Sequence, residues 1–124
     1  MISLYNIEKK LNIRFPKVYM ELYESDFEEI RKIQIQADAD YIIIKKFLKA
    51  QEIDEILDEF FDYWGYDIIP VAEAEYGDYI CLWYKDNRNE PSIIYWNYEL
   101  ALENPVEGIL FLYDSIHELI AELK

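Results

Sequence analysis

The stretch YDIIPVAEAEYGDYICLWYKDNRNEPSIIYWNY, residues 66–98, decides the fold of this chain. It contains three runs rich in aromatic and β-branched residues, separated by Tyr76-Gly77-Asp78 and by a polar loop over 85–91. Such runs, bounded by turn residues, are typical of strands. Pro91 has no N–H and must lie outside the hydrogen-bonded ladder. The predicted strands are Ile68–Ala74, Tyr79–Tyr84 and Ser92–Tyr98.

This stretch holds no pair of a nucleophile and a base and no set of metal ligands. We therefore expect the sheet to serve as a binding platform and not as a reaction centre. The sequence predicts no enzyme, no catalytic residue, no cofactor and no metal site.

Two helices are expected before the sheet. The first spans Leu4–Leu11, with Ser3 as its N-cap and Asn12 in the left-handed conformation that often follows a helix. The second begins at Pro16, whose missing N–H would be unpaired in a first turn anyway. Either this helix continues past Ser25, or Ser25 and Glu28 form a capping box for a separate turn.

The middle of the chain predicts a hairpin and a long helix. Ile33 and Ile35 alternate with polar residues, and Tyr41–Ile44 is β-branched, which favours two short strands. Asp38-Ala39-Asp40 lacks the Gly and the terminal Glu of a calcium loop and is interpreted as a turn. Residues 51–64 carry apolar side chains at helical spacing, so one helix is predicted from Gln51 to Trp64, ended by Gly65.

The C-terminal part adds a strand and a helix. Asn104-Pro105 and Gly108 precede a strand over Ile109–Tyr113, and Ser115 with Glu118 predicts a capping box for a helix ending near Leu123. Helices, then an antiparallel sheet, then a helix define an α+β fold. We predict a single domain over residues 1–124, with about four to six strands packed by N-terminal, middle and C-terminal helices.

Composition limits the environment and the partners. The chain has 124 residues, of which 52% are hydrophobic, enough for a core. Asp and Glu total 26 against 12 Lys and Arg, a formal net charge of -14. This charge disfavours direct binding of nucleic acid or anionic membranes and favours a basic protein partner. A single cysteine, Cys81, and the lack of a signal peptide or a long apolar stretch predict a cytoplasmic protein.

Several segments, in order, resemble the SUKH superfamily. The first is Ile7–Tyr19 (IEKKLNIRFPKVY), similar to the family's short helix followed by apolar-Pro-x-x-Tyr. Ile69-Pro70-Val71-Ala72, Gly77–Leu82 and Ile93–Trp96 resemble its central strands, and Leu110–Ser115 resembles its closing strand. The chain departs from the family pattern at residues 24–27, where Glu-Ser-Asp-Phe replaces a glycine-containing turn.

The resemblance implies an immunity protein, or antitoxin, that binds a cognate secreted or contact-delivered toxin, often a nuclease. The family has no shared catalytic residues that could be transferred to this chain. The alternative that it implies is an intracellular regulatory or scaffold domain, as in the yeast relatives. A third possibility is an enzyme or a small-ligand binder.

The candidate contacts for a basic partner fall into three groups. The first is the acidic side of the predicted middle helix, which could equally be a solvated face. The second surrounds the strand turn, where paired carboxylates could also act as acid and base, although no apolar pocket is predicted to raise the pKa of either. The third consists of aromatic residues that either fill the core or line a cleft, as Tyr84 and Tyr98 could also do. The predicted contact residues are Glu52, Glu55, Asp58, Glu59, Asp62, Glu73, Glu75, Tyr76, Asp78, Asp86, Trp83 and Trp96.

His117 and Cys81 are residue types that can bind metals or react, but both are interpreted as structural. His117 has no second His or Cys at metal-ligand spacing, so no zinc site is expected. Cys81 lies mid-strand between Ile80 and Leu82, and we expect a buried, unreactive thiol.

Overall fold

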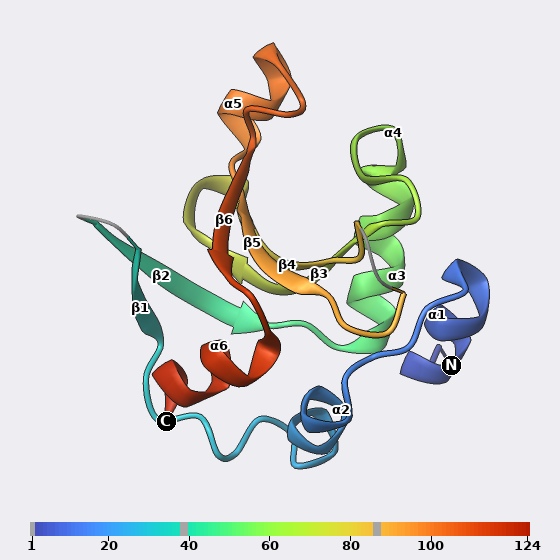
Figure 1. Cartoon of the computed structure of the whole chain (residues 1–124), viewed down its shortest axis with the longest axis vertical. Helices are drawn as coiled ribbons and strands as arrows, with labels where there is room; N and C mark the ends of the chain where they lie inside the picture. The colour runs from blue at the N-terminus through green and yellow to red at the C-terminus, as the bar shows by residue number, and fades with distance from the viewer. Residues whose placement is uncertain (1, 38–39, 86–87) are drawn as a thin grey trace.

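The computed structural model describes residues 2–37, 40–85 and 88–124 and confirms the α+β fold class. Six antiparallel strands form one sheet, surrounded by helices (Figure 1). The elements are α1 (Leu4–Leu11), α2 (Lys17–Glu24), β1 (Gln34–Ala37), β2 (Asp40–Phe47), α3 (Ala50–Glu59), α4 (Phe61–Trp64), β3 (Ile68–Ala74), the 3₁₀ turn η1 (Glu75–Gly77), β4 (Tyr79–Trp83), β5 (Ser92–Trp96), α5 (Tyr98–Glu103), β6 (Ile109–Tyr113) and α6 (Ile116–Leu123).

The sheet is a meander, because each strand pairs antiparallel with the next in the order β1-β2-β3-β4-β5-β6. Its register shifts between Ile44 and Lys46 in β2, between Pro70 and Ala72 in β3, and in the β5–β6 pair. Such bulges bend and twist a strand. The sheet curls so far that residues of both edge strands, β1 and β6, line one small hollow.

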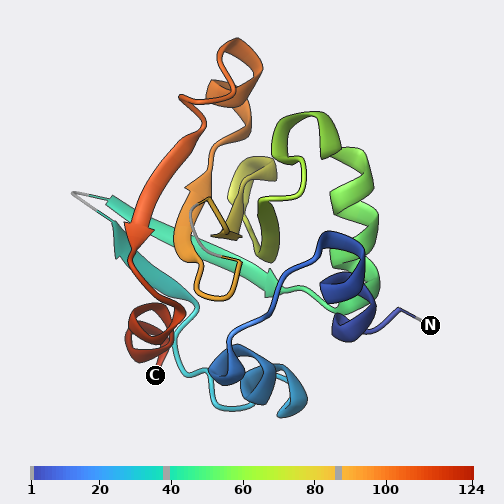
Figure 2. The same cartoon turned by 45° about the vertical axis from the view of Figure 1, so that its right-hand side comes forward.

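Both faces of the central strands are covered. On one face, Phe60 and Trp64 of the α3–α4 region pack against Tyr79 and Trp96. On the other side of the sheet, α6 lies against β1, β5 and β6, with α2 beside it (Figure 2). Burial of both faces explains why β3 and β4 are apolar along their length and do not alternate with polar residues.

The start of the fold follows the predictions. Ser3 accepts the Asn6 N–H, and the Asn6 side chain accepts the Ser3 N–H, which caps α1. Asn12 adopts φ 55°, the predicted left-handed conformation. The hairpin of β1 and β2 is confirmed, and its predicted turn at residues 38–39 lies outside the described residues.

Neither prediction for the end of α2 is correct. The helix ends at Glu24, and the Ser25 hydroxyl donates to the Leu22 carbonyl and does not cap a new turn. Asp26 and Phe27 both have positive φ, 57° and 62°, so two non-glycine residues make this bend in the left-handed conformation. Phe27 stacks on Phe47 at 5.1 Å, which holds it there.

The predicted helix over Gln51–Trp64 is two helices. Phe60 leaves the helical conformation (φ −107°, ψ 20°) and separates α3 from α4. Its ring inserts among the rings of Tyr63, Trp64, Tyr79, Trp96 and Tyr98, at centroid distances between 5.1 and 6.3 Å. Packing therefore overrides the helical periodicity at this residue.

Two strand predictions are too long, and one helix was not predicted. β4 ends at Trp83, and β5 ends at Trp96, so Tyr98 begins α5 and does not extend a strand. The Asn97 side chain accepts the Leu100 N–H at 3.0 Å and caps α5. At α6, Ser115 is the N-cap residue but makes no side-chain cap, because Glu118 accepts the Asp114 N–H instead.

Candidate functional site

Positive charge is distributed very unevenly along this chain. Lys85 and Arg88 are the only lysine or arginine residues between positions 50 and 123. The elements α4, η1 and α5 come from this part of the chain; α4 and α5 lie at the top of Figure 1, and Asp78, next to η1, accepts a hydrogen bond from the first residue of α5. We call residues 59–62, 75–78 and 97–107 the acidic end. Its acids are Glu59, Asp62, Glu75, Asp78, Glu99, Glu103 and Glu107.

An aromatic cluster holds the parts of the acidic end together. The indole of Trp96 is 1% exposed and lies 5.1 Å from the Phe60 ring and 5.8 Å from the Tyr63 ring. It also lies 5.9 Å from the ring of Tyr98, the first residue of α5. The cluster thus joins the α3–α4 junction to the start of α5, and the charged residues lie around an apolar support.

A buried carboxylate makes the second connection. Asp78, 4% exposed, accepts hydrogen bonds from the Tyr98 N–H at 2.9 Å and from the Tyr95 hydroxyl. Burial raises the pKa of Tyr95, and Asp78 adds to this effect, so the phenol remains a donor. The side chain of Asp78 therefore braces the start of α5.

Between η1 and α5 the surface is hollowed to about 280 Å³, lined by Tyr76, Asp78, Asn97 and Glu99. Tyr76 is 85% exposed and has φ 61°, a conformation that is uncommon for a bulky residue. The exposed ring stands beside carboxylates from two separate segments. This arrangement suits recognition of a basic side chain by charge and by ring contact.

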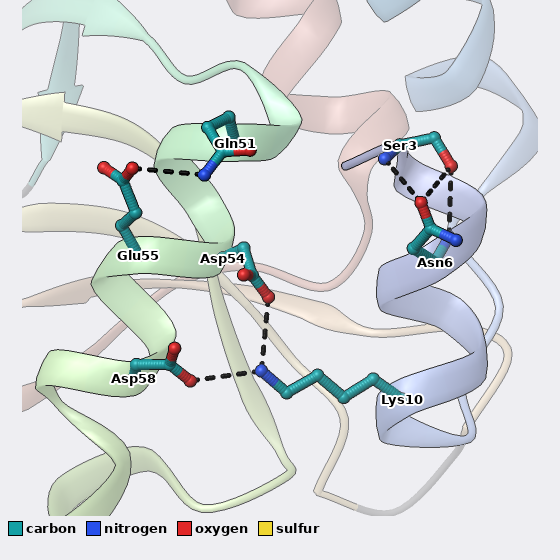
Figure 3. Close-up of polar contacts among 7 residues, drawn as sticks. All are labelled: Ser3, Asn6, Lys10, Gln51, Asp54, Glu55 and Asp58. Atoms are coloured by element: carbon teal, nitrogen blue, oxygen red, sulfur yellow. Dashed lines mark hydrogen bonds and ion pairs between the residues drawn. The ribbon is translucent and has the colours of Figure 1, made fainter. Parts of the chain in front are cut away.

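Much of the predicted acidic helix face is paired with cations. Lys10 Nζ of α1 reaches Asp54 at 3.2 Å and Asp58 at 3.1 Å (Figure 3). The Asp58 carboxylate is the main cause of a raised pKa for Lys10. Glu52 pairs with Lys46, and this bond lowers the pKa of Glu52. These contacts give Glu52 and Asp58 a structural partner within the chain.

The remaining acids of the helix and those of the turn differ in how many partners they have within the chain. Glu55 accepts from the Gln51 amide at 3.2 Å, also drawn in Figure 3. Glu73 pairs with Lys45 at 3.2 Å. Within the described ranges, Glu59, Asp62 and Glu75 take part in no ion pair.

The predicted aromatic contacts are corrected in one case. Trp96 lies in the core and presents no ring surface to a partner, because the cluster encloses it. Trp83 is half-buried, with Lys85 Nζ 5.2 Å from its ring centre. Asp86 lies outside the described residues. The other members of the set remain predicted contacts.

Sequence reasoning missed the acids of α5 and the loop after it. Glu99, Glu103 and Glu107 follow Asn97 at four-residue spacing, and Asn before a run of good helix formers is a helix-start signal. The aromatic residues at the end of the preceding strand continue the β pattern through Tyr98 and therefore mask this helix-start signal.

The groups with potential reactivity are placed as follows. Cys81 is buried, and burial raises the pKa of its thiol well above the ordinary value. His117 is exposed on α6. Across residues 2–37, 40–85 and 88–124, no three His, Cys, Asp or Glu side chains are grouped so that they could hold a metal ion.

The model of the SMI1 / KNR4 family (SUKH-1) matches residues 3–122, and the chain belongs to this family. The family includes toxin immunity proteins, and its members are generally binding proteins without enzymatic activity. No curated protein matches the chain. In the part of the chain that is described, none of the helices has the length and apolar character needed to cross a bilayer.

Proposed function

We propose that this protein is a cytoplasmic immunity protein that binds a basic toxin domain and blocks it by covering its active site. The observation that carries the proposal is the acidic end, which contains seven carboxylates and no Lys or Arg. A toxin that binds phosphates, such as a nuclease, needs a basic surface, and such a surface is complementary to this end. Membership of a family that includes immunity proteins supports the same role.

The mechanism is occlusion by a protein contact. Complementary charge accelerates diffusional encounter and aligns the two surfaces, while shape and apolar contacts determine how long the complex lasts. The rigid support under the acidic end, formed by Trp96 and Asp78, limits the conformational entropy lost on binding. No chemical step on the toxin is required.

The proposal predicts that a toxin domain is encoded next to this gene, and the experiment measures the association rate of that domain at low and high salt. In one variant Glu59, Glu75 and Glu99 are changed to Lys. In the matched control Glu21, Glu24 and Glu122, which are exposed and lie outside the acidic end, are changed to Lys. Both variants change the net charge equally, so only the position of the change differs.

We expect the first variant to associate at least about tenfold more slowly at low salt and to lose protection of cells that express the toxin. The control should stay within about twofold of the wild type. Equal effects of the two variants would show that overall charge, and not the acidic end, governs binding. A wild-type protein that neither binds the toxin domain nor protects cells would contradict the proposed function.

The alternative function is a regulatory or scaffold domain with an intracellular protein partner unrelated to toxins. The family also supports this function, since its members are generally immunity or regulatory proteins. The acidic end would then bind a basic segment of that partner. The two functions differ in one cheap observation, because an immunity gene lies beside a toxin gene.

A further inference from the structure

Large apolar side chains are exposed in α5, in the loop after it and in β6. The arm formed by α5 and its following loop projects from the sheet between β5 and β6 (Figures 1 and 2). Along this arm and the adjoining edge strand, large apolar side chains are exposed in close succession. These residues, which we call the apolar ridge, are Leu100, Leu102, Val106, Leu110 and Phe111.

The backbone of β6 is open next to this ridge. The Asn97 N–H donates to the Gly108 carbonyl at 2.8 Å, so these two residues form a hydrogen-bonded pair of the β5–β6 ladder. Hydrogen-bonded and non-hydrogen-bonded pairs alternate in an antiparallel ladder. Phe111, opposite Ile94, is therefore in a non-hydrogen-bonded pair, and its N–H and C=O point away from β5.

The edge of β6 lacks the features that usually protect such a strand. Ile109–Tyr113 contains no charged residue and no proline, and Phe111 is 55% exposed. Among the described strands, none pairs with β6 on its outer side, and a small hollow of about 100 Å³ separates it from Gln36 and Ala37 of β1. α6 packs against β1 at the opposite edge of the sheet, and it also contacts β5 and β6.

We propose that β6 accepts an extended segment of the basic partner as a seventh strand, and this inference rests on the proposed function. The partner's backbone pairs with the outward groups of Phe111, and its apolar side chains contact Leu110 on one face of the sheet and Phe111 on the other. Lys or Arg residues flanking that segment meet Glu99, Glu103 and Glu107. Strand addition provides affinity through main-chain hydrogen bonds and specificity through alternate side chains.

Charge decides between a basic segment and a second copy of this chain. Two copies, each with a net charge of -14, repel one another at the outset. A segment with basic flanks removes this conflict.

The test uses three synthetic peptides. The first alternates Val and Thr and has two Lys residues at each end, the second has Glu in place of Lys, and the third has Pro in its central position. We expect the Lys-flanked peptide to shift the NMR signals of residues 109–113 and α5 and to slow amide exchange at Phe111. The Pro peptide should bind at least about tenfold more weakly, because it cannot complete the ladder.

Two variants make the test specific. Phe111→Lys places a charge on the open edge, and Tyr41→Lys is the matched control on β2, where the side chain is 62% exposed. Phe111→Lys should weaken binding of the Lys-flanked peptide by about tenfold, while Tyr41→Lys should change it less than about twofold. Far-ultraviolet circular dichroism checks that both variants are folded.

Binding of all three peptides alike, binding elsewhere or no binding would overturn strand addition to β6. A concentration-dependent dimer that Phe111→Lys abolishes would also overturn it, in favour of a second copy. If the toxin domain binds both variants equally, strand addition is wrong and the proposed function stands. If the toxin domain does not bind but the Lys-flanked peptide pairs with β6, the function is wrong and the site stands.

Discussion

The two ends of this molecule use charge in opposite ways. Around α1, α2 and the C-terminal half of β2, carboxylates pair with lysines, as Lys10 does with Asp54 and Asp58. At the acidic end the seven carboxylates have no cation nearby in sequence, and every ion pair found among the described residues lies outside it.

The difference shows which charges the fold itself uses. Exposed ion pairs contribute little to stability, commonly about 0–1 kcal/mol each. The acidic end is instead stabilised from beneath, by the rings around Trp96 and by the hydrogen bonds of Asp78. Its exposed carboxylates make no ion pair among the described residues, so they remain available to a partner.

The strongest test of this division is Trp96→Ala. Removing a buried aromatic side chain costs about 3–5 kcal/mol, so the free energy of unfolding should fall by that amount in urea titrations. The cluster joins the α3–α4 junction to α5, and hydrogen exchange should therefore rise at both α4 and α5. Phe61→Ala is the control, because its ring is 43% exposed, and we expect a loss under about 1 kcal/mol. Equal losses would mean that the cluster is not the support we describe.

A second test removes the buried carboxylate. Asp78→Ala leaves the Tyr95 hydroxyl and the Tyr98 N–H without their acceptor, and we expect a loss of about 1–3 kcal/mol in unfolding experiments. Tyr95→Phe removes one donor only, and the double variant should lose less than the sum of the two single losses. Strict additivity would show that the Tyr95–Asp78 bond does not form in solution.

The sequence predicted the meander because its signals are local. Strand runs from Ile68 to Trp96 are bounded by turn residues, and the cap at Ser3 and the left-handed Asn12 involve near neighbours only. The break at Phe60 could not be predicted from periodicity, since it results from packing against residues up to 38 positions away, at Tyr98. The bend at Asp26 and Phe27 depends in the same way on a distant ring, that of Phe47.

The candidate site was predicted only in part, for a related reason. Sequence spacing showed that the acids of α3 share a face, but not that Lys10, far away in sequence, would neutralise two of them. It also placed Trp96 among possible anchors, although a residue on a strand buried on both faces has no open side. Glu99 and its neighbours belong to the site because β5 ends before α5 begins, and the strand pattern in the sequence does not indicate that end.

A third test measures the charge pairing at the opposite end. Lys10→Met keeps the aliphatic part of the side chain and removes the bonds to Asp54 and Asp58, so stability at low salt should fall by at most about 1 kcal/mol. The loss should shrink in high salt, where exposed charges are screened. Lys9→Met is the control, because Lys9 lies in the same last turn of α1 and interacts equally with the helix dipole. A loss that is equal for both variants would assign the effect to the dipole.

The smallest effect we expect concerns Glu52, whose pKa is lowered below its ordinary value of 4.5 mainly by the bond with Lys46. A lowered pKa in the folded state means that the carboxylate adds stability above pH 4.5 and that this contribution disappears as the pH falls through the lowered pKa. Glu52→Gln should therefore be less stable than the wild type at neutral pH by a few tenths of a kcal/mol, roughly the value of an exposed pair. Once the pH has fallen below the lowered pKa of Glu52, the two proteins should unfold at the same urea concentration. Glu55→Gln is the matched control at neutral pH and should cost less, because Glu55 accepts from the Gln51 amide and makes no ion pair among the described residues. A Glu52→Gln difference that persists unchanged into acid would show that this carboxylate contributes by packing, and the contrast between a paired end and an unpaired end would then not extend to α3.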